Sequence, residues 1–257
     1  ACTITTRAPG PSARSFRCER REAMSMTAGY ERPSDAFSLA AAALAAGGSD
    51  DLCSPLRAAV AMPGAVVSTL GPPMGSQTVC ASSKLGARID EIQIDLGEGP
   101  SWEALRTRRP VTAADLRVQG GALWPGAWAA LRELEVGSLY AFPLFVGTVS
   151  IGSIATYSTA ARDLSDSDLA GMSRLAAIVS GTLLRRALDR LEVPGDEAPD
   201  EPYSRREVHQ ATGMVAARNG IDVDDALMLL RGHAYATGRP VRDVAADVIA
   251  RILDLVL

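Results

Sequence analysis

The pattern of apolar positions predicts a β-sheet in the first two thirds of the chain. Two β-prone runs, residues 65–70 and 77–83, flank the turn-forming sequence GPPMGS. Two further runs, residues 139–146 and 149–158, are separated by a Gly-Thr pair, which is the spacing of a two-residue hairpin. Gly152 interrupts the last of these runs, and we expect it to mark a β-bulge.

Apolar residues at intervals of three and four predict helices around these strands. Ser34 precedes an alanine-rich run that ends near a pair of glycines, as expected for a capped helix. Ser165 and Asp168 have the spacing of a capping box at the start of the longest periodic stretch. The apolar stripe of that stretch is long enough to face its own sheet, a partner helix, or both in turn. The predicted helices cover residues 34–47, 51–62 and 165–191, and with the strands they indicate an α+β fold.

The composition of residues 193–202 separates this region from a small C-terminal domain. The segment VPGDEAPDEP combines three prolines with four acids and is typical of an exposed linker. Residues 31–192 then form the first domain and residues 203–257 the second. Residues 1–30 are expected to be a disordered extension. Their arginine-rich start lacks an apolar segment and resembles either an organelle transit peptide or, as we favour, an upstream extension.

Three amphipathic segments follow the linker and predict a three-helix bundle. Ser204 and Glu207 have the spacing of another capping box, and Asp222 is a favourable N-cap for the second segment. Pro240 stands in the first turn of the third segment, whose apolar face includes Ile252. Short connections require the helices to pack closely. The predicted helices cover residues 204–219, 223–237 and the stretch from 240 onward.

Charge and cysteine content restrict the function classes. The net charge is −4, so no overall field draws the molecule onto nucleic acid. The four cysteines fit no zinc framework and include no CxxC pair, which favours a reducing, cytoplasmic location. No apolar run reaches membrane-spanning length, so we expect no membrane partner.

Residue types that carry most protein chemistry are sparse. His209 and His233 are the two histidines, and they lie on different predicted helices without cysteines nearby. We assign them to packing or surface hydrogen bonding, and we expect neither a metal site nor a catalytic residue. Cys53 and Cys80 are expected to be small buried apolar residues. A solvated face is the simplest interpretation of three acids, Asp90, Glu91 and Asp95.

One set of motifs resembles the GAF domain family over about residues 35–190. The sequence IDEIQIDLGEGPSWEAL contains the family's glutamine, its GEGP run and a Glu-Ala pair ahead of a helix. Pro-Val, Trp-Pro, FPL and Ile-Gly follow in the family's order. The resemblance implies an antiparallel sheet with flanking helices and a small-molecule pocket. The matching residues are Gln93, Gly97–Pro100, Glu103–Ala104, Pro110–Val111, Trp124–Pro125, Phe142–Leu144, Gly147 and Ile151–Gly152.

The resemblance leaves the occupant of that pocket unknown. Haem ligation is disfavoured because no histidine precedes His209, and neither Cys53 nor Cys80 lies in an obvious attachment loop for a bilin. We therefore assign no cofactor, and the sensed signal is an unidentified small-molecule effector or a redox cue. Some GAF domains reduce free methionine sulfoxide with cysteines. That enzyme hypothesis is kept as an alternative, and it predicts loss of activity on Cys80→Ser.

The C-terminal segment resembles the ANTAR family of RNA-binding transcription antiterminators. The family's Ala-x-Gly, acid–Ala, Leu-Arg-x-x-Ala and Val-x-x-Val-Ala elements recur in order over nearly all of residues 204–255. Thr212 stands where many relatives have lysine, so one phosphate contact is in doubt. Small residues at the expected helix contacts allow the bundle to close: Ala211, Gly213, Ala226, Ala234 and Ala245.

Seven arginines and eight acids in residues 201–257 make non-specific electrostatic binding weak. RNA recognition then depends on base contacts in unpaired loops, with stacking by arginine or an aromatic ring. The expected RNA-binding residues are Arg218, Arg231, Tyr235, Arg239 and Arg242.

These features together predict a signal-responsive regulator rather than an enzyme. The GAF-like domain senses a cue, and the ANTAR-like domain binds stem-loop leader RNA and so favours an antiterminator hairpin. The resemblance implies a homodimer, with the helix over residues 165–191 as the candidate for coupling and dimerisation. The alternative binding hypothesis is a DNA-binding helix-turn-helix regulator, which predicts a steep salt dependence.

Overall fold

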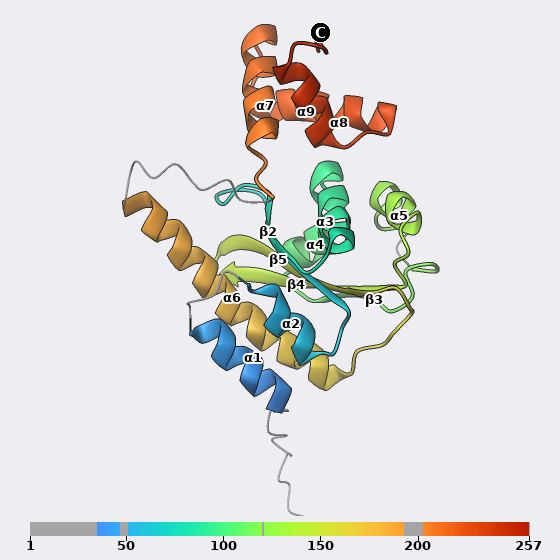
Figure 1. Cartoon of the computed structure of the whole chain (residues 1–257), viewed down its shortest axis with the longest axis vertical. Helices are drawn as coiled ribbons and strands as arrows, with labels where there is room; N and C mark the ends of the chain where they lie inside the picture. The colour runs from blue at the N-terminus through green and yellow to red at the C-terminus, as the bar shows by residue number, and fades with distance from the viewer. Residues whose placement is uncertain (1–34, 47–50, 120, 193–202, 257) are drawn as a thin grey trace, which may run out of the picture. The chain divides into compact units, whose positions relative to one another are not determined.

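The computed structural model describes most of the two predicted domains (Figure 1). The N-terminal extension, Ser34 and the linker over residues 193–202 lie outside the described residues, so what we expect of them stays a prediction. The described residues are 35–46, 51–119, 121–192 and 203–256.

A sheet forms the centre of the first domain, as the apolar pattern predicted, and it is antiparallel, as the GAF resemblance implied. In the described residues it has five strands in the order β2-β1-β5-β4-β3. The predicted hairpin is confirmed: β4 and β5 are joined at Gly147, whose φ of 58° suits glycine because a side chain would be strained there. The strands are β1 (Gly64–Thr69), β2 (Gln77–Ala81), β3 (Val111–Ala113), β4 (Ser138–Val146) and β5 (Val149–Ser158).

Helices cover both faces of the sheet and enclose one apolar core on each (Figure 1). One face packs against α1, α2 and α6, and the other against α3, α4 and α5. Alternate residues of each strand therefore enter opposite cores. The predicted α+β class is confirmed. The helices are α1 (Asp35–Ala45), α2 (Cys53–Ala59), α3 (Lys84–Leu96), α4 (Pro100–Thr107), α5 (Pro125–Arg132) and α6 (Asp166–Glu192).

The interruption at Gly152 is a bulge, as predicted. The register between β4 and β5 shifts beside this residue. Ile151 and Ile154 consequently enter the same core, although side chains three residues apart point to opposite faces of a regular strand. A Cβ atom at Gly152 would lie 1.9 Å from the carbonyl oxygen of Ser68 on β1. The position is therefore restricted to glycine by the neighbouring strand.

The GEGP run is explained by a buried glutamine at the end of α3. The Gln93 side chain is fully buried, and its Oε1 accepts a hydrogen bond of 2.9 Å from the Ser101 N–H at the start of α4. A Cβ at Gly99 would lie 2.8 Å from the Gln93 side chain, so a larger residue does not fit without displacement. Glu98 accepts a hydrogen bond of 2.6 Å from the Ala127 N–H in α5. The motif thus fixes how α3, α4 and α5 meet.

The long helix α6 begins with the predicted capping box. The Ser165 N–H donates to Asp168 Oδ2 (3.1 Å), and the Asp168 N–H donates to Ser165 Oγ (3.2 Å). One face of α6 packs on the sheet and on α1, while Leu188 near its C-terminal end is 51% exposed. The buried face consists of Met172, Leu175, Ala176, Val179 and Leu183.

The C-terminal domain is the predicted three-helix bundle. Asp222 caps the second helix, because its Oδ1 accepts a hydrogen bond of 2.8 Å from the Asp225 N–H. Four of the five small residues expected at helix contacts are buried, namely Ala211, Ala226, Ala234 and Ala245. The helices are α7 (Arg206–Asn219), α8 (Val223–Thr237) and α9 (Val241–Ile249).

Three details predicted for the bundle are wrong. Ser204 is not the N-cap, since α7 begins at Arg206 and Ser204 Oγ accepts only from the Arg206 N–H (3.3 Å). Gly213 is exposed, and a Cβ there would meet nothing within 4 Å, so this glycine is not needed for close packing. Ile252 is exposed because α9 ends at Ile249.

We predict that Gly152→Ala destabilises the protein, because the new methyl group meets backbone atoms of β1 that cannot move independently of the sheet. The expected loss is at least about 1–3 kcal/mol, the usual range for overpacking. Gly181→Ala on α6 is the control: its Cβ has open space, and alanine raises helix stability by about 0.5–1 kcal/mol. Urea unfolding of the two variants measures both changes, and equal midpoints would contradict the prediction.

Candidate functional site

The residues predicted to bind RNA do not share one environment. Tyr235, in the last turn of α8, is 69% exposed, and Arg239 follows it just beyond the helix end. Arg239 Nη2 lies 2.8 Å from Asp247 Oδ2, which orients the guanidinium. Arg218 forms an ion pair with Asp254 and lies before the start of α8. Since α8 spans 15 residues, roughly 22 Å, Arg218 is separated from Tyr235 and Arg239.

The other two candidate arginines make contacts inside the molecule. Arg231 Nη2 donates a hydrogen bond of 2.9 Å to the carbonyl oxygen of Ile94 on α3. Arg242 Nη2 donates one of 3.0 Å to the carbonyl oxygen of Ser204. Burial lowers the pKa of Arg231 below its usual value, and the nearby Arg205 acts in the same direction. RNA contact by Arg231 would therefore require release from α3.

Asp95, near the end of α3, connects the sensor domain to the bundle. Its Oδ1 accepts a hydrogen bond of 2.6 Å from Arg205 Nη2, and the two side chains are only 10% and 6% exposed. Its Oδ2 accepts one of 3.1 Å from the Val241 N–H, in the first turn of α9. The N-cap of α9 is Pro240, which has no capping side chain. One carboxylate thus joins a guanidinium and a helix N-terminus.

Asp90 is fully buried one turn earlier on α3. Ser68 Oγ on β1 and Thr78 Oγ1 on β2 donate hydrogen bonds of 2.9 Å and 2.5 Å to its two oxygens. Burial raises the pKa of Asp90 to about 6, although both hydroxyl groups and Arg205 oppose the shift. The expectation of a solvated acidic face is therefore wrong for Asp90 and Asp95. Each carboxylate has internal donors that the sequence pattern does not reveal.

A cavity of about 310 Å³ lies beside α3 at the start of the bundle. Its lining contains one acid, Glu91, which pairs with Arg88 at 2.6 Å. Cations outnumber acids in the lining, so the cavity suits an anionic group better than a cationic one. The cationic lining residues are Lys84, Arg88, Arg205 and Arg242.

The histidines lie on two different helices of the bundle. Burial lowers the pKa of His209, and the neighbouring Arg205 acts in the same direction. His233 lines an apolar cavity of about 490 Å³ with Met228 and Val256. No group of three metal-ligating side chains occurs within the part of the chain that the structure describes. Thr212 is buried and donates to the Val208 carbonyl oxygen (2.6 Å).

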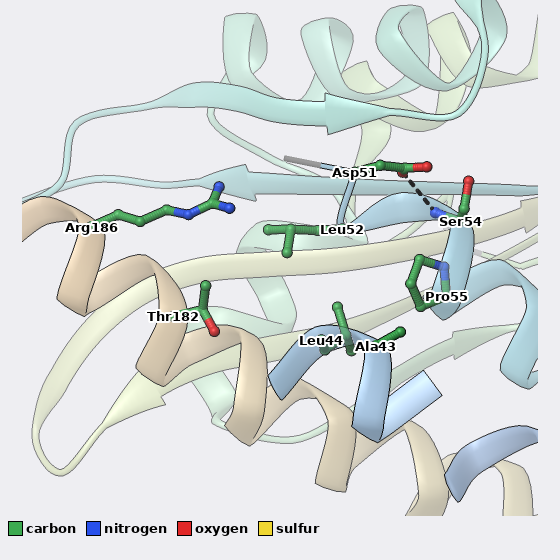
Figure 2. A pocket seen from close by; sticks show the side chains of 8 residues that line it. All are labelled: Ala43, Leu44, Asp51, Leu52, Ser54, Pro55, Thr182 and Arg186. Atoms are coloured by element: carbon green, nitrogen blue, oxygen red, sulfur yellow. Dashed lines mark hydrogen bonds between the residues drawn. The ribbon is translucent and has the colours of Figure 1, made fainter. Parts of the chain in front are cut away.

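A smaller cavity of about 180 Å³ lies where α1, α2 and α6 meet (Figure 2). Leu44 and Leu52 line its apolar part, while Thr182 and Arg186 reach it from α6. Asp51 stands at its edge and accepts a hydrogen bond of 2.9 Å from the Ser54 N–H in α2. The volume is large enough for a small molecule of a few heavy atoms.

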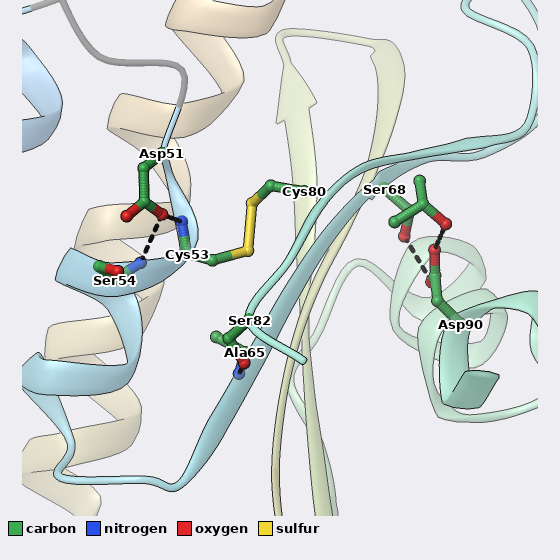
Figure 3. Close-up of a disulfide and its surroundings, with 9 residues drawn as sticks. Asp51, Cys53, Ser54, Ala65, Ser68, Cys80, Ser82 and Asp90 are labelled. Carbon is green, nitrogen blue, oxygen red and sulfur yellow. Dashed lines mark hydrogen bonds between the residues drawn. A yellow bond between two sulfur atoms is a disulfide. The ribbon is translucent and has the colours of Figure 1, made fainter. Parts of the chain in front are cut away.

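A disulfide joins Cys53 and Cys80 next to this cavity (Figure 3). Cys53 is buried in the first turn of α2, and Cys80 is half-buried on β2, with Cα atoms 6.2 Å apart. The expectation that both are separate apolar core residues is wrong. They are 27 positions apart in the sequence, and only the packing of α2 against the sheet brings them together. No spacing rule in the sequence signals this pair.

Comparisons with known families agree with this architecture. The family model described as "GAF domain" matches residues 55–183, half of the chain, and the chain therefore belongs to the GAF domain family. The model described as "ANTAR domain" matches residues 200–249. The protein is thus a GAF–ANTAR regulator, a sensor domain followed by an ANTAR domain.

No curated protein matches the chain. Among the described helices, none has both the length and the apolar composition needed to cross a membrane.

Several solved structures are similar to the chain at low identity. The GAF domain of an Acinetobacter phosphoenolpyruvate-protein phosphotransferase is 12% identical with a TM-score of 0.49, covering 63% of this chain and 96% of that one. The corresponding Coxiella burnetii domain is 12% identical with a TM-score of 0.47, covering 62% and 95%. The type II free methionine-R-sulfoxide reductase of Thermoplasma acidophilum is 18% identical with a TM-score of 0.41, covering 59% and 96%.

We predict that Asp90 makes stability depend on pH. Its folded pKa of about 6 exceeds the ordinary value of 3.8, so the folded state binds the proton more tightly. The resulting stabilisation is complete below about pH 3.8 and is lost as pH rises through about 6. Asp90→Asn removes this loss, so the variant should gain stability relative to wild type as pH rises from about 3.8 to about 6, and the difference should then level off.

Urea unfolding at several pH values measures this difference. Glu135→Gln, an exposed acid that does not contribute to the Asp90 shift, is the control and should leave the wild-type difference from Asp90→Asn unchanged. Parallel curves for wild type and Asp90→Asn would contradict the assignment.

Proposed function

We propose that this protein is a signal-responsive, cytoplasmic antiterminator that binds stem-loop leader RNA through its bundle and does not act as an enzyme. The observation that carries the proposal is the ANTAR match over residues 200–249. In the proposed mechanism, a cue received by the GAF domain changes the affinity of the bundle for RNA. Bound RNA adopts the antiterminator hairpin, and transcription continues.

Tyr235 and Arg239 are the proposed centre of the RNA-binding surface. The Tyr235 ring is exposed, so it can meet a partner without any change in the packing of the bundle. An exposed ring can stack on a base displayed by a hairpin loop, and the adjacent guanidinium can hydrogen-bond to base edges or phosphate. Three further arginines extend this surface only if each gives up its present contact and binds RNA instead: Arg242, Arg231 and Arg218.

The charge balance of the bundle favours loop recognition over duplex DNA binding. Near-equal numbers of arginines and acids provide little counterion release, which is the main source of affinity for duplex backbones. Base stacking in unpaired loops does not need that excess of charge. A helix-turn-helix regulator would therefore show duplex DNA affinity with a steep salt slope, and we expect neither.

The proposed active form is a homodimer that uses the end of α6. Leu188 is exposed there on the helix that also packs on the sheet, so one element contacts both the sensor core and solvent. A second copy of α6 would cover this apolar position. Two bundles would then be available for paired hairpin loops.

We predict that Tyr235→Ala weakens binding to a tandem stem-loop RNA by about 5- to 100-fold, the loss expected when one stacked base loses its aromatic partner. Tyr235→Phe is the control and should bind within about twofold of wild type, because the ring is retained. A gel shift against the RNA, a scrambled-loop RNA and duplex DNA provides the measurement. Equal affinity for intact and scrambled loops would refute the proposed function.

We also predict that Leu188→Glu shifts the protein from dimer to monomer, because an isolated carboxylate cannot be buried at the proposed interface. Leu39→Glu is the control: Leu39 is an exposed leucine on α1, and its substitution should leave the mass unchanged. Light scattering of the full chain gives the mass directly. A wild-type monomer, or a dimer that survives Leu188→Glu, would place the interface elsewhere.

A further inference from the structure

The Cys53–Cys80 disulfide attaches an edge strand to the helix beside it. β2 is the outermost strand of the sheet, and β1 is its one neighbouring strand among the described residues. Figure 3 shows the bond running from α2 to β2. An edge strand has a backbone hydrogen-bond ladder on one side only. Side-chain attachments therefore contribute more to its position than they do for a central strand.

β2 has a second side-chain attachment on the other face of the sheet. Its register with β1 shifts between Val67, which pairs with Cys80, and Ser68, which pairs with Thr78. This bulge allows two residues that are close in sequence to face opposite layers. Cys80 is bonded toward α2, while Thr78 donates to Asp90 on α3. Movement of β2 toward or away from α2 therefore acts on α3.

The helix α3 in turn holds the bundle. Its Asp95 accepts hydrogen bonds from Arg205 and the Val241 N–H. Its Ile94 carbonyl accepts from Arg231, one of the candidate RNA-binding residues. A continuous path of bonded and packed groups thus leads from the two sulfur atoms, through one strand and one helix, to the RNA-binding domain.

We propose that Cys53 and Cys80 are a reversible redox site through which a peroxide controls RNA binding, an inference that rests on the proposed function. Cys80 is the more exposed of the two and reacts first: its thiol reduces hydrogen peroxide to water and becomes a sulfenic acid. The Cys53 thiol then displaces the hydroxyl group as a second water, forming the disulfide. A cellular dithiol reverses the step by thiol–disulfide exchange and is itself oxidised to a disulfide.

The oxidised form is the form that retains the bundle on α3. With the disulfide closed, β2 is attached on both faces and keeps Thr78 against Asp90. Reduction removes the attachment to α2 and loosens β2, so α3 holds Arg205 and Arg231 less firmly. RNA then competes for Arg231 with less opposition, and the reduced protein binds RNA more tightly.

The test compares RNA binding by full-length protein treated with hydrogen peroxide or with dithiothreitol. We expect the reduced protein to bind the tandem stem-loop RNA at least about 5-fold more tightly, the lower end of typical coupling between sites. Cys80→Ser should bind like the reduced form under both treatments. Cys2→Ser with Cys18→Ser is the control that should respond like wild type, because the proposed pair remains intact.

A second measurement separates this inference from the proposed function. Amide hydrogen exchange should report faster exchange in β2 and α3 after reduction of wild type, with no such change in Cys80→Ser, whether or not the protein binds RNA. Loss of RNA binding in both redox states, with the exchange difference intact, would refute the function and leave the redox site standing.

Three results would overturn the redox site. The first is equal RNA affinity and equal exchange in the two redox states of wild type. The second is a disulfide that dithiothreitol does not reduce in the folded protein, which would make it a structural crosslink. The third is turnover of free methionine sulfoxide that Cys80→Ser abolishes, which would assign the pair to catalysis.

Discussion

A buried carboxylate needs hydrogen-bond donors from the protein itself, and the donors to Asp95 come from residues that are far from it in the sequence. Arg205 follows it by 110 residues and Val241 by 146. Desolvation of such a group is costly unless a cation and hydrogen bonds compensate, so neither partner can be removed without leaving the carboxylate exposed to an apolar surrounding. The contact between sensor and bundle therefore depends on Asp95, with a further hydrogen bond from Arg231 to the Ile94 carbonyl oxygen. Asp90 has the same constraint within the sensor, where two hydroxyl groups act as donors.

Local features of this fold were predictable because their causes are local. The hairpin at Gly147, the bulge at Gly152 and the capping box at Ser165 each depend on residues within a few positions. Ser204 is not the cap because α7 begins one residue later, with Arg205 at the N-cap position, and the contact of Arg205 with Asp95 is one that no local rule includes. The same limitation explains why Ile252 was wrongly assigned to the apolar face of α9. The apolar periodicity of the sequence continues past Ile249, but the helix ends there.

The candidate site was less predictable because its groups come together only in three dimensions. The five RNA-binding residues were selected by type and by family pattern, and the structure separates them into exposed and engaged groups. Asp90 and Asp95 occur in a helix of mixed apolar and polar residues, where acidic side chains usually face solvent. The sequence does not predict the disulfide between Cys53 and Cys80, because two cysteines at that separation are equally compatible with being buried as separate thiols.

The N-cap residue of α9 has no capping side chain, and this limits how far the bundle is independent of the first domain. Residues 203–256 form a bundle with its own apolar core, yet the carboxylate that caps the start of α9 belongs to Asp95 in the sensor domain. If the bundle were joined to a different domain, it would lose the hydrogen bond from the Val241 N–H to Asp95. Such a capping contact is worth about 0.5–2 kcal/mol in other helices, and it would be kept only if the new domain supplied an acid at the same place. The bundle therefore reaches its full stability only beside a domain that places an acid where Asp95 stands.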